Sequence, residues 1–247
     1  MTPTAASALR IVTFGDLDTG IWGATWASSD AALALRAGGS ALTAPATIET
    51  GDEGEDWTLR ADGVELTVSP EAEPVSSEVL GGFDQLGRLS GHATLSDGNT
   101  VTIEALCRRG IRDALRPGAA DSIRDVSCWF EPDRGLALTA VRPRKTKGHD
   151  RDLIAAAVLD VEGAHPIAEP RLSTTYTEDG RPARAGLELW RAEDENGEQS
   201  YPTRAAGEVA GPGLVTAAEG MEVQAEPFRW HSRGAEGTGV YLLVRPR

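Results

Sequence analysis

The residues of this chain best suited to acid-base chemistry lie between positions 105 and 130, in the stretch ALCRRGIRDALRPGAADSIRDVSCWF. This stretch contains two Arg-Asp pairs, Arg112-Asp113 and Arg124-Asp125. Adjacent residues of a β-strand point to opposite faces, so one member of each pair is expected to face inward. A carboxylate buried in this way is costly unless it has a partner, so each aspartate is a candidate for a specific role.

Two roles are open for these carboxylates. In the structural interpretation, an inward arginine from a neighbouring strand pairs with the aspartate, and the buried ion pair links two halves of the protein. In the functional interpretation, the carboxyl group lies in an apolar cavity, where desolvation raises its pKa and makes it a proton donor near neutral pH. Asp113 and Asp125 are then the catalytic candidates. Two further candidates for proton transfer are His231 and Tyr176. The candidates for contact with a substrate include Arg112 and Arg124.

Tryptophan side chains are the second group that could form a site. Trp22 and Trp26 lie four positions apart in GIWGATWAS, so on a strand they project from the same face. They form either a pair of core aromatics or an aromatic wall of an apolar pocket, to which Trp129 and Trp230 could add. Such a wall suits a flat or unsaturated apolar ligand and would attract positive charge that develops during a reaction.

The sequence favours a protein without a metal or a nucleotide cofactor. It has no Gly-Lys phosphate loop, no dinucleotide fingerprint and no nucleophile-elbow serine. The cysteines form no Cys-x-x-Cys pair. The histidines are His92, His149, His165 and His231, and none of them has a neighbour at metal-ligand spacing. Cys107 is in phase with apolar residues of its strand, so we expect it to pack in a core and to form no disulfide with Cys128.

The net charge of −14 disfavours several classes of partner. Binding to nucleic acid or to an anionic membrane surface requires clustered cations, and we interpret the basic cluster at residues 142–147 as a solvated loop rather than a phosphate site. No apolar run is long enough for a membrane helix, and the N-terminus lacks the features of a secretory signal. We therefore expect a cytoplasmic protein that binds a hydrophobic small molecule, with no nucleic acid partner and no membrane insertion. The oligomeric state is left open.

The elements that must position these residues are β-strands. Val64–Val68 and Thr100–Cys107 alternate apolar and polar residues, which is the period of a half-buried strand. Dipeptides that favour tight hairpin turns recur along the chain, at positions 62–63, 97–98, 179–180 and 196–197. Together these signals predict an all-β, antiparallel protein of about fourteen to eighteen strands.

Two short apolar runs lack this alternation. AALALRA, at residues 31–37, has a composition that also suits a helix, whereas we assign residues 152–160 to a strand that is buried on both faces. The predicted number of strands suits two small barrels better than one sandwich. The stretch from Arg112 to Ser122 has the weakest strand signals. The predicted division is therefore an N-terminal barrel over residues 1–115 and a C-terminal barrel over residues 116–247.

The central hairpin, GHATLSDGNTVTIEALCRRGIRD, resembles the centre of the AttH-like and hydroxyneurosporene-synthase-like proteins. In that group a strand with an Asp-Gly turn returns into a segment of the type Gly-x-Arg-Asp-His-Ser-Trp-Gly. The start of this motif is matched here, and Ala-Leu-Arg at residues 114–116 replaces its His-Ser-Trp part. The downstream Arg and Trp of the group match residues 124 and 129, or residues 124–129 are themselves a degenerate copy of the motif.

The resemblance implies two lipocalin-like (calycin) β-barrels in tandem with an apolar cavity within or between them. Activities in the group include carotenoid hydration, prenyl-chromanol cyclisation and cofactor-free cycloaddition on polyketide products. The resemblance therefore implies a cofactor-independent enzyme for a terpenoid or polyketide-like molecule. The alternative is a binding protein of lipocalin type that performs no chemistry. The motif histidine is missing here, so an acid-base role at that position is not implied.

Overall fold

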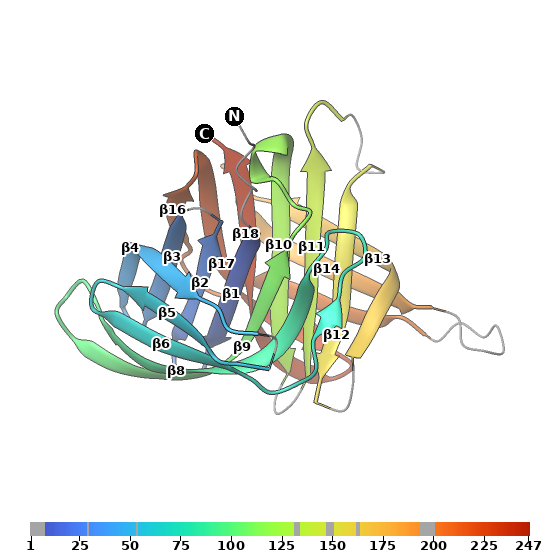
Figure 1. Ribbon diagram of the computed structural model, residues 1–247. Coiled ribbons are helices and arrows are strands. Elements are labelled where there is room, and N and C mark those ends of the chain that lie inside the picture. The colour runs from blue at the N-terminus through green and yellow to red at the C-terminus, as the bar shows by residue number, and fades with distance from the viewer. Residues whose placement is uncertain are drawn as a thin grey trace.

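The computed structural model of the protein describes residues 8–28, 30–52, 54–130, 134–146, 151–161, 164–192 and 201–247. These residues form an all-β, antiparallel structure in two halves (Figure 1), as the sequence predicts. Within this part of the chain, no helix is long and apolar enough to cross a membrane.

The first half is a closed barrel. Its nine strands are hydrogen-bonded in the order β6-β5-β4-β3-β2-β1-β9-β8-β7, and β6 also pairs with β8. This second pairing closes the ring and leaves β7 outside it. The strands are β1 (Leu9–Asp16), β2 (Ile21–Ala27), β3 (Ala31–Ala37), β4 (Ser40–Glu49), β5 (Trp57–Ala61), β6 (Val64–Pro70), β7 (Val75–Ser76), β8 (Phe83–Thr94) and β9 (Thr100–Arg112).

The second half repeats this topology. Its order is β15-β14-β13-β12-β11-β10-β18-β17-β16, with β15 paired to β17, so every strand corresponds to the strand nine places earlier. The sequence shows no exact repeat, so the duplication is visible only in the structure. The strands are β10 (Ala120–Phe130), β11 (Arg134–Pro143), β12 (Leu153–Asp160), β13 (Ala164–Tyr176), β14 (Pro182–Arg191), β15 (Thr203–Val209), β16 (Leu214–Ala218), β17 (Met221–Ser232) and β18 (Ala235–Pro246).

A short connection joins the halves. The first sheet ends at Arg112 and the second begins at Ala120, with the 3₁₀ helix η1 (Pro117–Ala119) between them. This change of sheet falls within the stretch of weak strand signals. The division into two domains at residue 115 stays a prediction, since each half would have to be shown to fold by itself.

The ambiguous apolar runs are both strands. Residues 31–37 form β3, in which Ala32 and Ala34 face the layer between the barrels while Leu33 and Leu35 face the interior of the first barrel. Both faces are therefore buried, which explains the missing polar alternation. Residues 153–160 form β12, as predicted, and have the same arrangement. The turn expected at positions 196–197 lies outside the described residues, as do Lys147 and His149.

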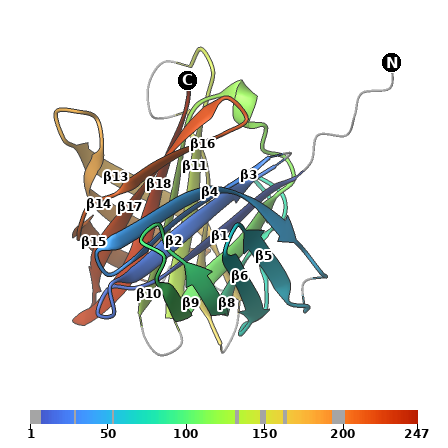
Figure 2. The same ribbon diagram turned by 90° about the vertical axis from the view of Figure 1, so that its left-hand side faces the viewer.

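Apolar side chains fill three regions. One cluster occupies the interior of the first barrel, and a second occupies the interior of the second barrel. The third lies between the barrels, where β1, β9, β10 and β18 meet (Figure 2). Side chains pack into both interiors, and of the two places expected for an apolar cavity, within or between the barrels, the clefts described below occupy the second. The open volumes relevant to a site lie along the boundary between the halves.

Candidate functional site

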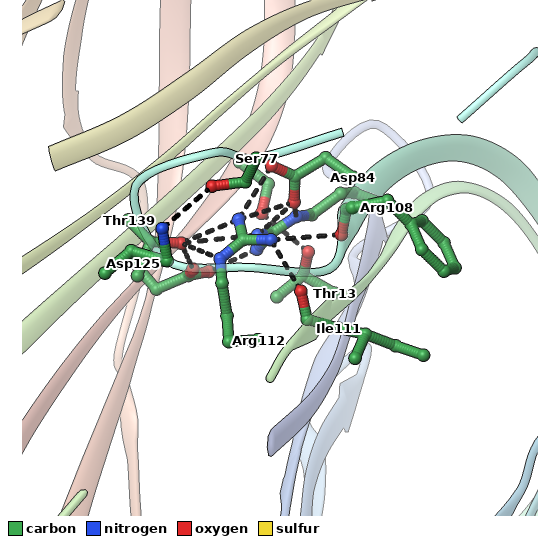
Figure 3. Close-up of polar contacts among 11 residues, drawn as sticks. Thr13, Ser77, Asp84, Arg108, Ile111, Arg112, Asp125 and Thr139 are labelled. Carbon is green, nitrogen blue, oxygen red and sulfur yellow. Dashed lines mark hydrogen bonds and ion pairs between the residues drawn. The ribbon is translucent and has the colours of Figure 1, made fainter. Parts of the chain in front are cut away.

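A buried cluster of charges lies in the layer between the barrels (Figure 3). The first barrel contributes Asp84 from β8 and Arg108 and Arg112 from β9, whereas the second contributes Asp125 from β10 and Thr139 from β11. All five side chains are at most 2% exposed. Arg108 and Arg112 lie four positions apart on β9, so strand alternation directs both into the same layer.

Arg108 joins the two halves. Its Nη1 lies 2.5 Å from Asp125 Oδ1 across the boundary, and its Nε donates to Asp84 Oδ1 over 2.7 Å within its own barrel. Thr139 Oγ1 donates to Asp125 Oδ2 over 2.6 Å. The buried ion pair between the halves, predicted in the structural interpretation of the Arg-Asp pairs, is therefore present.

Arg112 anchors the other side of Asp84. Its Nη2 lies 2.7 Å from Asp84 Oδ2, and its Nε donates to Thr139 Oγ1 over 3.2 Å. Burial by itself would raise the pKa of Asp84, but the two guanidinium groups outweigh burial and hold that pKa below its usual range. Asp84 is therefore ionised at neutral pH and can accept hydrogen bonds but not donate a proton.

One cleft reaches this cluster. It has a volume of about 570 Å³ and lies between the β7 segment of the first half and β12 and β13 of the second. Its walls are mainly aliphatic, with Val75, Val79, Ile154 and Ile167 among them, and Asp84 lines it as the member of the buried charge cluster that reaches the open volume. We call this opening the Asp84 cleft. Its size is in the range of pockets that hold small molecules.

A second cleft occupies the corresponding place on the other side of the boundary. It measures about 540 Å³ and is lined by β3, β4 and β16, which are the counterparts of β12, β13 and β7. Glu219, at its rim, bonds to Ser28 Oγ and to the backbone N–H of Asp30, 3.0 Å from Oε1. We call it the Glu219 cleft.

The two clefts differ in the side chains of the layer beside them. Thr13 and Ser127 contact each other over 2.6 Å where β1 crosses β10, and they mark corresponding positions in the two barrels. Counting along the paired strands from this contact gives the counterparts of the charged residues of the first barrel: Ala225 for Asp84, Val240 for Arg108 and Val244 for Arg112. The charges are thus confined to the side of the Asp84 cleft.

Three predicted catalytic residues are exposed and do not reach this cluster. Asp113 follows the last residue of β9 and turns to solvent, and Tyr176 is 41% exposed. The His231 side chain is 52% exposed and lies 3.9 Å from Glu236. Strand alternation near the end of β17 buries Trp230 and turns His231 outward. Of the pair Arg112-Asp113, the inward-facing member is therefore Arg112, and the catalytic role of Asp113 in a buried cavity is not supported by its position.

The predicted aromatic residues are core residues. Trp22 and Trp26 project from the same face, as expected, and pack in the layer between the barrels, 2% and 1% exposed. Trp129 packs in the same layer and also lines a smaller opening of about 210 Å³. Trp230 packs against Phe228 inside the second barrel, with ring centroids 5.6 Å apart. A role of these rings in ligand binding stays a prediction.

The remaining predicted residues are buried in separate places. Arg124 pairs with Asp152 over 2.5 Å inside the second barrel. Cys107 and Cys128 are both buried and unpaired, and burial raises the pKa of each thiol. Among the described residues, no three His, Cys, Asp or Glu side chains converge on a possible metal site.

Sequence reasoning did not single out Asp84, Arg108 or Thr139. Two signals were present. The order Phe-Asp-Gln-Leu at residues 83–86 breaks strand alternation, and two adjacent arginines at 108–109 require that one of them faces each side of the sheet. Thr139 carries no such signal, because a threonine in a strand is ordinary.

The fold and the site define an all-β protein of two lipocalin-like barrels in tandem, with a small-molecule-sized cleft between them. Among solved structures, the AttH (NE1406) of Nitrosomonas europaea has this fold, with a TM-score of 0.67 and 9% identity over 98% of this chain and 93% of that chain. CghA solved with Sch210972 has a TM-score of 0.62 and 12% identity, over 97% of this chain and 89% of that chain. A second structure of CghA has a TM-score of 0.58 and 12% identity, over 97% of this chain and 88% of that chain. The expected resemblance to AttH-like proteins is thus confirmed at the level of the fold. No protein-family model and no curated protein matches the sequence.

Proposed function

We propose that this protein binds an apolar small molecule in the Asp84 cleft and acts on it without a cofactor. The observation that carries the proposal is that a buried, ionised carboxylate lines this cleft beside mainly aliphatic residues, whereas on the side of the Glu219 cleft the counterpart of Asp84 is Ala225. CghA, which shares the fold, was solved with the small molecule Sch210972, and this adds support for a ligand of that size class.

The proposed chemistry depends on orientation. Walls from both barrels hold a flexible substrate in a folded conformer, and bringing reacting atoms together in this way lowers a barrier substantially. Asp84 is ionised and both its guanidinium partners are engaged, so the cleft floor favours ring formation or isomerisation over a step that needs a proton from the enzyme. In this proposal Asp125 is a positioning residue, since it holds Arg108.

The alternative is a carrier of lipocalin type. One observation favours it: the buried charge cluster, as described above, offers an acceptor to the cleft but no proton donor. A carrier and an orientation-based enzyme share the same cleft and differ only in the fate of the ligand. Incubation with polyene and polyketide-like candidates, followed by chromatography with mass analysis, separates them, because a carrier returns every ligand unchanged.

The test of the site uses matched tryptophan substitutions. Ala168 lines the Asp84 cleft from an exposed bulge between Ile167 and Glu169, so Ala168→Trp fills the opening without entering a core. Thr43 is exposed and lines the Glu219 cleft, so Thr43→Trp is the control. We expect Ala168→Trp to weaken retinol binding, measured by ligand fluorescence, at least about tenfold and Thr43→Trp to leave it unchanged. Equal effects of the two variants would contradict the proposal.

A further inference from the structure

The hydrogen-bond donors and acceptors of the Asp84 cleft indicate which functional group its ligand has. We propose that the cleft selects apolar molecules bearing a hydrogen-bond donor, such as an alcohol, an amine or an amide N–H, over molecules bearing a carboxylate. This inference rests on the proposed function, because it concerns the ligand of the same cleft.

Arg112 has no donor left for a ligand. A guanidinium group carries five N–H bonds. The Nε of Arg112 donates to Thr139, Nη1 donates to the carbonyl oxygens of Phe83 and Ile111, and Nη2 donates to Asp84 and Thr139. A carboxylate that entered the cleft would therefore have to break one of these bonds to pair with Arg112.

Asp84, in contrast, has acceptor capacity left. Its Oδ1 accepts from Arg108 Nε, Arg108 Nη2 and Arg112 Nη2, whereas its Oδ2 accepts from Arg112 Nη2 alone among the described residues. A carboxylate oxygen can accept about two hydrogen bonds. Asp84 also lines the cleft, so the unused capacity belongs to a group at the open volume.

The charges of the buried cluster also disfavour an anionic ligand. Asp84 and Asp125 balance Arg108 and Arg112, so the cluster has no net charge with which to attract an anion. A ligand carboxylate would lie closest to another carboxylate and would lose its hydration in a largely aliphatic cleft. A ligand hydroxyl would instead replace its bond to water with a bond to an ionised acceptor, which is among the stronger hydrogen bonds in proteins.

The rest of the cleft does not reverse this preference. Glu78 at the rim is exposed and adds negative charge. Ser77 Oγ accepts from the backbone N–H of Leu80 over 3.2 Å, and Ser76 is exposed; the hydroxyl groups of both can donate to an alcohol oxygen as well as to a carboxylate, and they add no positive charge. The part of the chain that the structure describes contributes no Lys or Arg to the lining of the opening.

Three retinoids test the inference, since they share one polyene and differ at one end. Retinol carries a donor, retinoic acid carries a carboxylate, and methyl retinoate carries neither a donor nor a charge. Binding is followed by quenching of protein tryptophan fluorescence. We expect retinol to bind roughly tenfold or more tighter than methyl retinoate, and methyl retinoate to bind tighter than retinoic acid. Equal binding of the alcohol and the acid, or tighter binding of the acid, would overturn the inference.

Substitutions locate the preference. Asp84→Asn leaves both arginines in place and gives the cluster a net positive charge, so the ratio of retinol to retinoic acid affinity should fall at least about tenfold. Glu78→Gln removes one negative charge at the exposed rim and should change the ratio less than about twofold, because water and salt screen that charge. An unchanged ratio in folded Asp84→Asn refutes the inference, and the wild-type ranking decides it alone if that variant does not fold.

The same experiment distinguishes this inference from the proposed function. If none of the three retinoids gives saturable quenching, or if Ala168→Trp leaves their binding unchanged, the Asp84 cleft is not the binding site and the proposed function fails. If all three bind in the cleft without the expected ranking, the site stands and only the donor preference is refuted.

Discussion

Glu226 should make the stability of the protein depend on pH in the neutral range. Its side chain lies on the interior face of the second barrel, opposite Tyr241 on β18, and is only 3% exposed. The backbone of Gly213 packs against the carboxyl group, and Oε1 has no hydrogen-bond partner among the described residues. The nearest cation is Arg181, 3.6 Å away, and that side chain is 42% exposed and shared with Asp179.

Burial is the main cause of the shift at Glu226, and it raises the pKa from 4.5 to about 7; Arg181 opposes the shift and Asp179 adds to it. When folding raises the pKa of a carboxyl group, the group contributes its full stabilisation at pH values below the pKa that it has in the unfolded chain. This stabilisation is lost as the pH rises through the pKa that the group has in the folded protein. One pKa unit is worth about 1.4 kcal/mol. Between about pH 5 and pH 8 the free energy of unfolding of the wild type should therefore fall by roughly 2–3 kcal/mol. A protein with glutamine at this position would not show this fall.

The assay is thermal unfolding of Glu226→Gln and wild type across this pH range. For a chain of this size, the expected difference corresponds to about 4–12 °C in Tm, with the variant gaining on the wild type as pH rises. Glu236→Gln, on the neighbouring strand and 66% exposed, is the control and should follow the wild type at every pH. If Glu226→Gln and wild type keep a constant difference from acid to alkaline pH, the carboxyl group is already ionised in the folded protein and the reasoning is wrong.

Two further predictions follow from buried groups. Cys107 and Cys128 should not react with a colorimetric thiol reagent in the native protein and should both react after unfolding, because both are buried and their pKa values are raised; rapid native labelling would contradict the packing. Asp125→Ala should lose roughly 3–5 kcal/mol of unfolding free energy in urea. A fivefold variant that copies the apolar side of the boundary should instead unfold within about 2 kcal/mol of wild type: Asp84→Ala, Arg108→Val, Arg112→Val, Asp125→Ile after its counterpart Ile11, and Thr139→Trp after its counterpart Trp26. A stability equal to or below that of the single variant would refute this account.

Much of the fold could be predicted from local patterns. The hairpin of β8 and β9 follows from alternation on both sides of the turn at Asp97-Gly98, and β12 follows from an apolar run that is followed at once by the turn-like sequence Val-Glu-Gly-Ala at residues 161–164. The closure of each barrel could not be predicted in this way, because β6–β8 and β15–β17 pairing joins strands with no local signal of partnership. An apolar cavity was expected within or between the barrels, and only the packing of the side chains shows that the clefts lie along the boundary.

The site could be predicted in part, because strand alternation is also a local pattern. Alternation correctly implied that one member of each Arg-Asp pair is buried, yet it could not decide which one. At the end of β9 the buried member is Arg112, because the strand stops there and Asp113 turns to solvent. In the middle of β10 both members are buried, since Arg124 faces the second barrel and Asp125 faces the layer between barrels. The broken alternation at residues 83–86 marks Asp84 as unusual, but its pairing with Arg108 and Arg112 depends on tertiary contacts that the sequence does not reveal.

The duplicated topology gives an internal reference for why the charges are there. At the corresponding positions the second barrel uses Ala225, Val240 and Val244, so this layer can be packed without any ion pair. Buried ion pairs rarely stabilise a fold more than apolar residues of similar size would. Stability alone therefore does not explain Asp84, Arg108 and Arg112 on one side of the boundary. A fixed, ionised acceptor at the floor of one cleft is what these residues add, and that is why we assign the function to the Asp84 cleft and not to the Glu219 cleft.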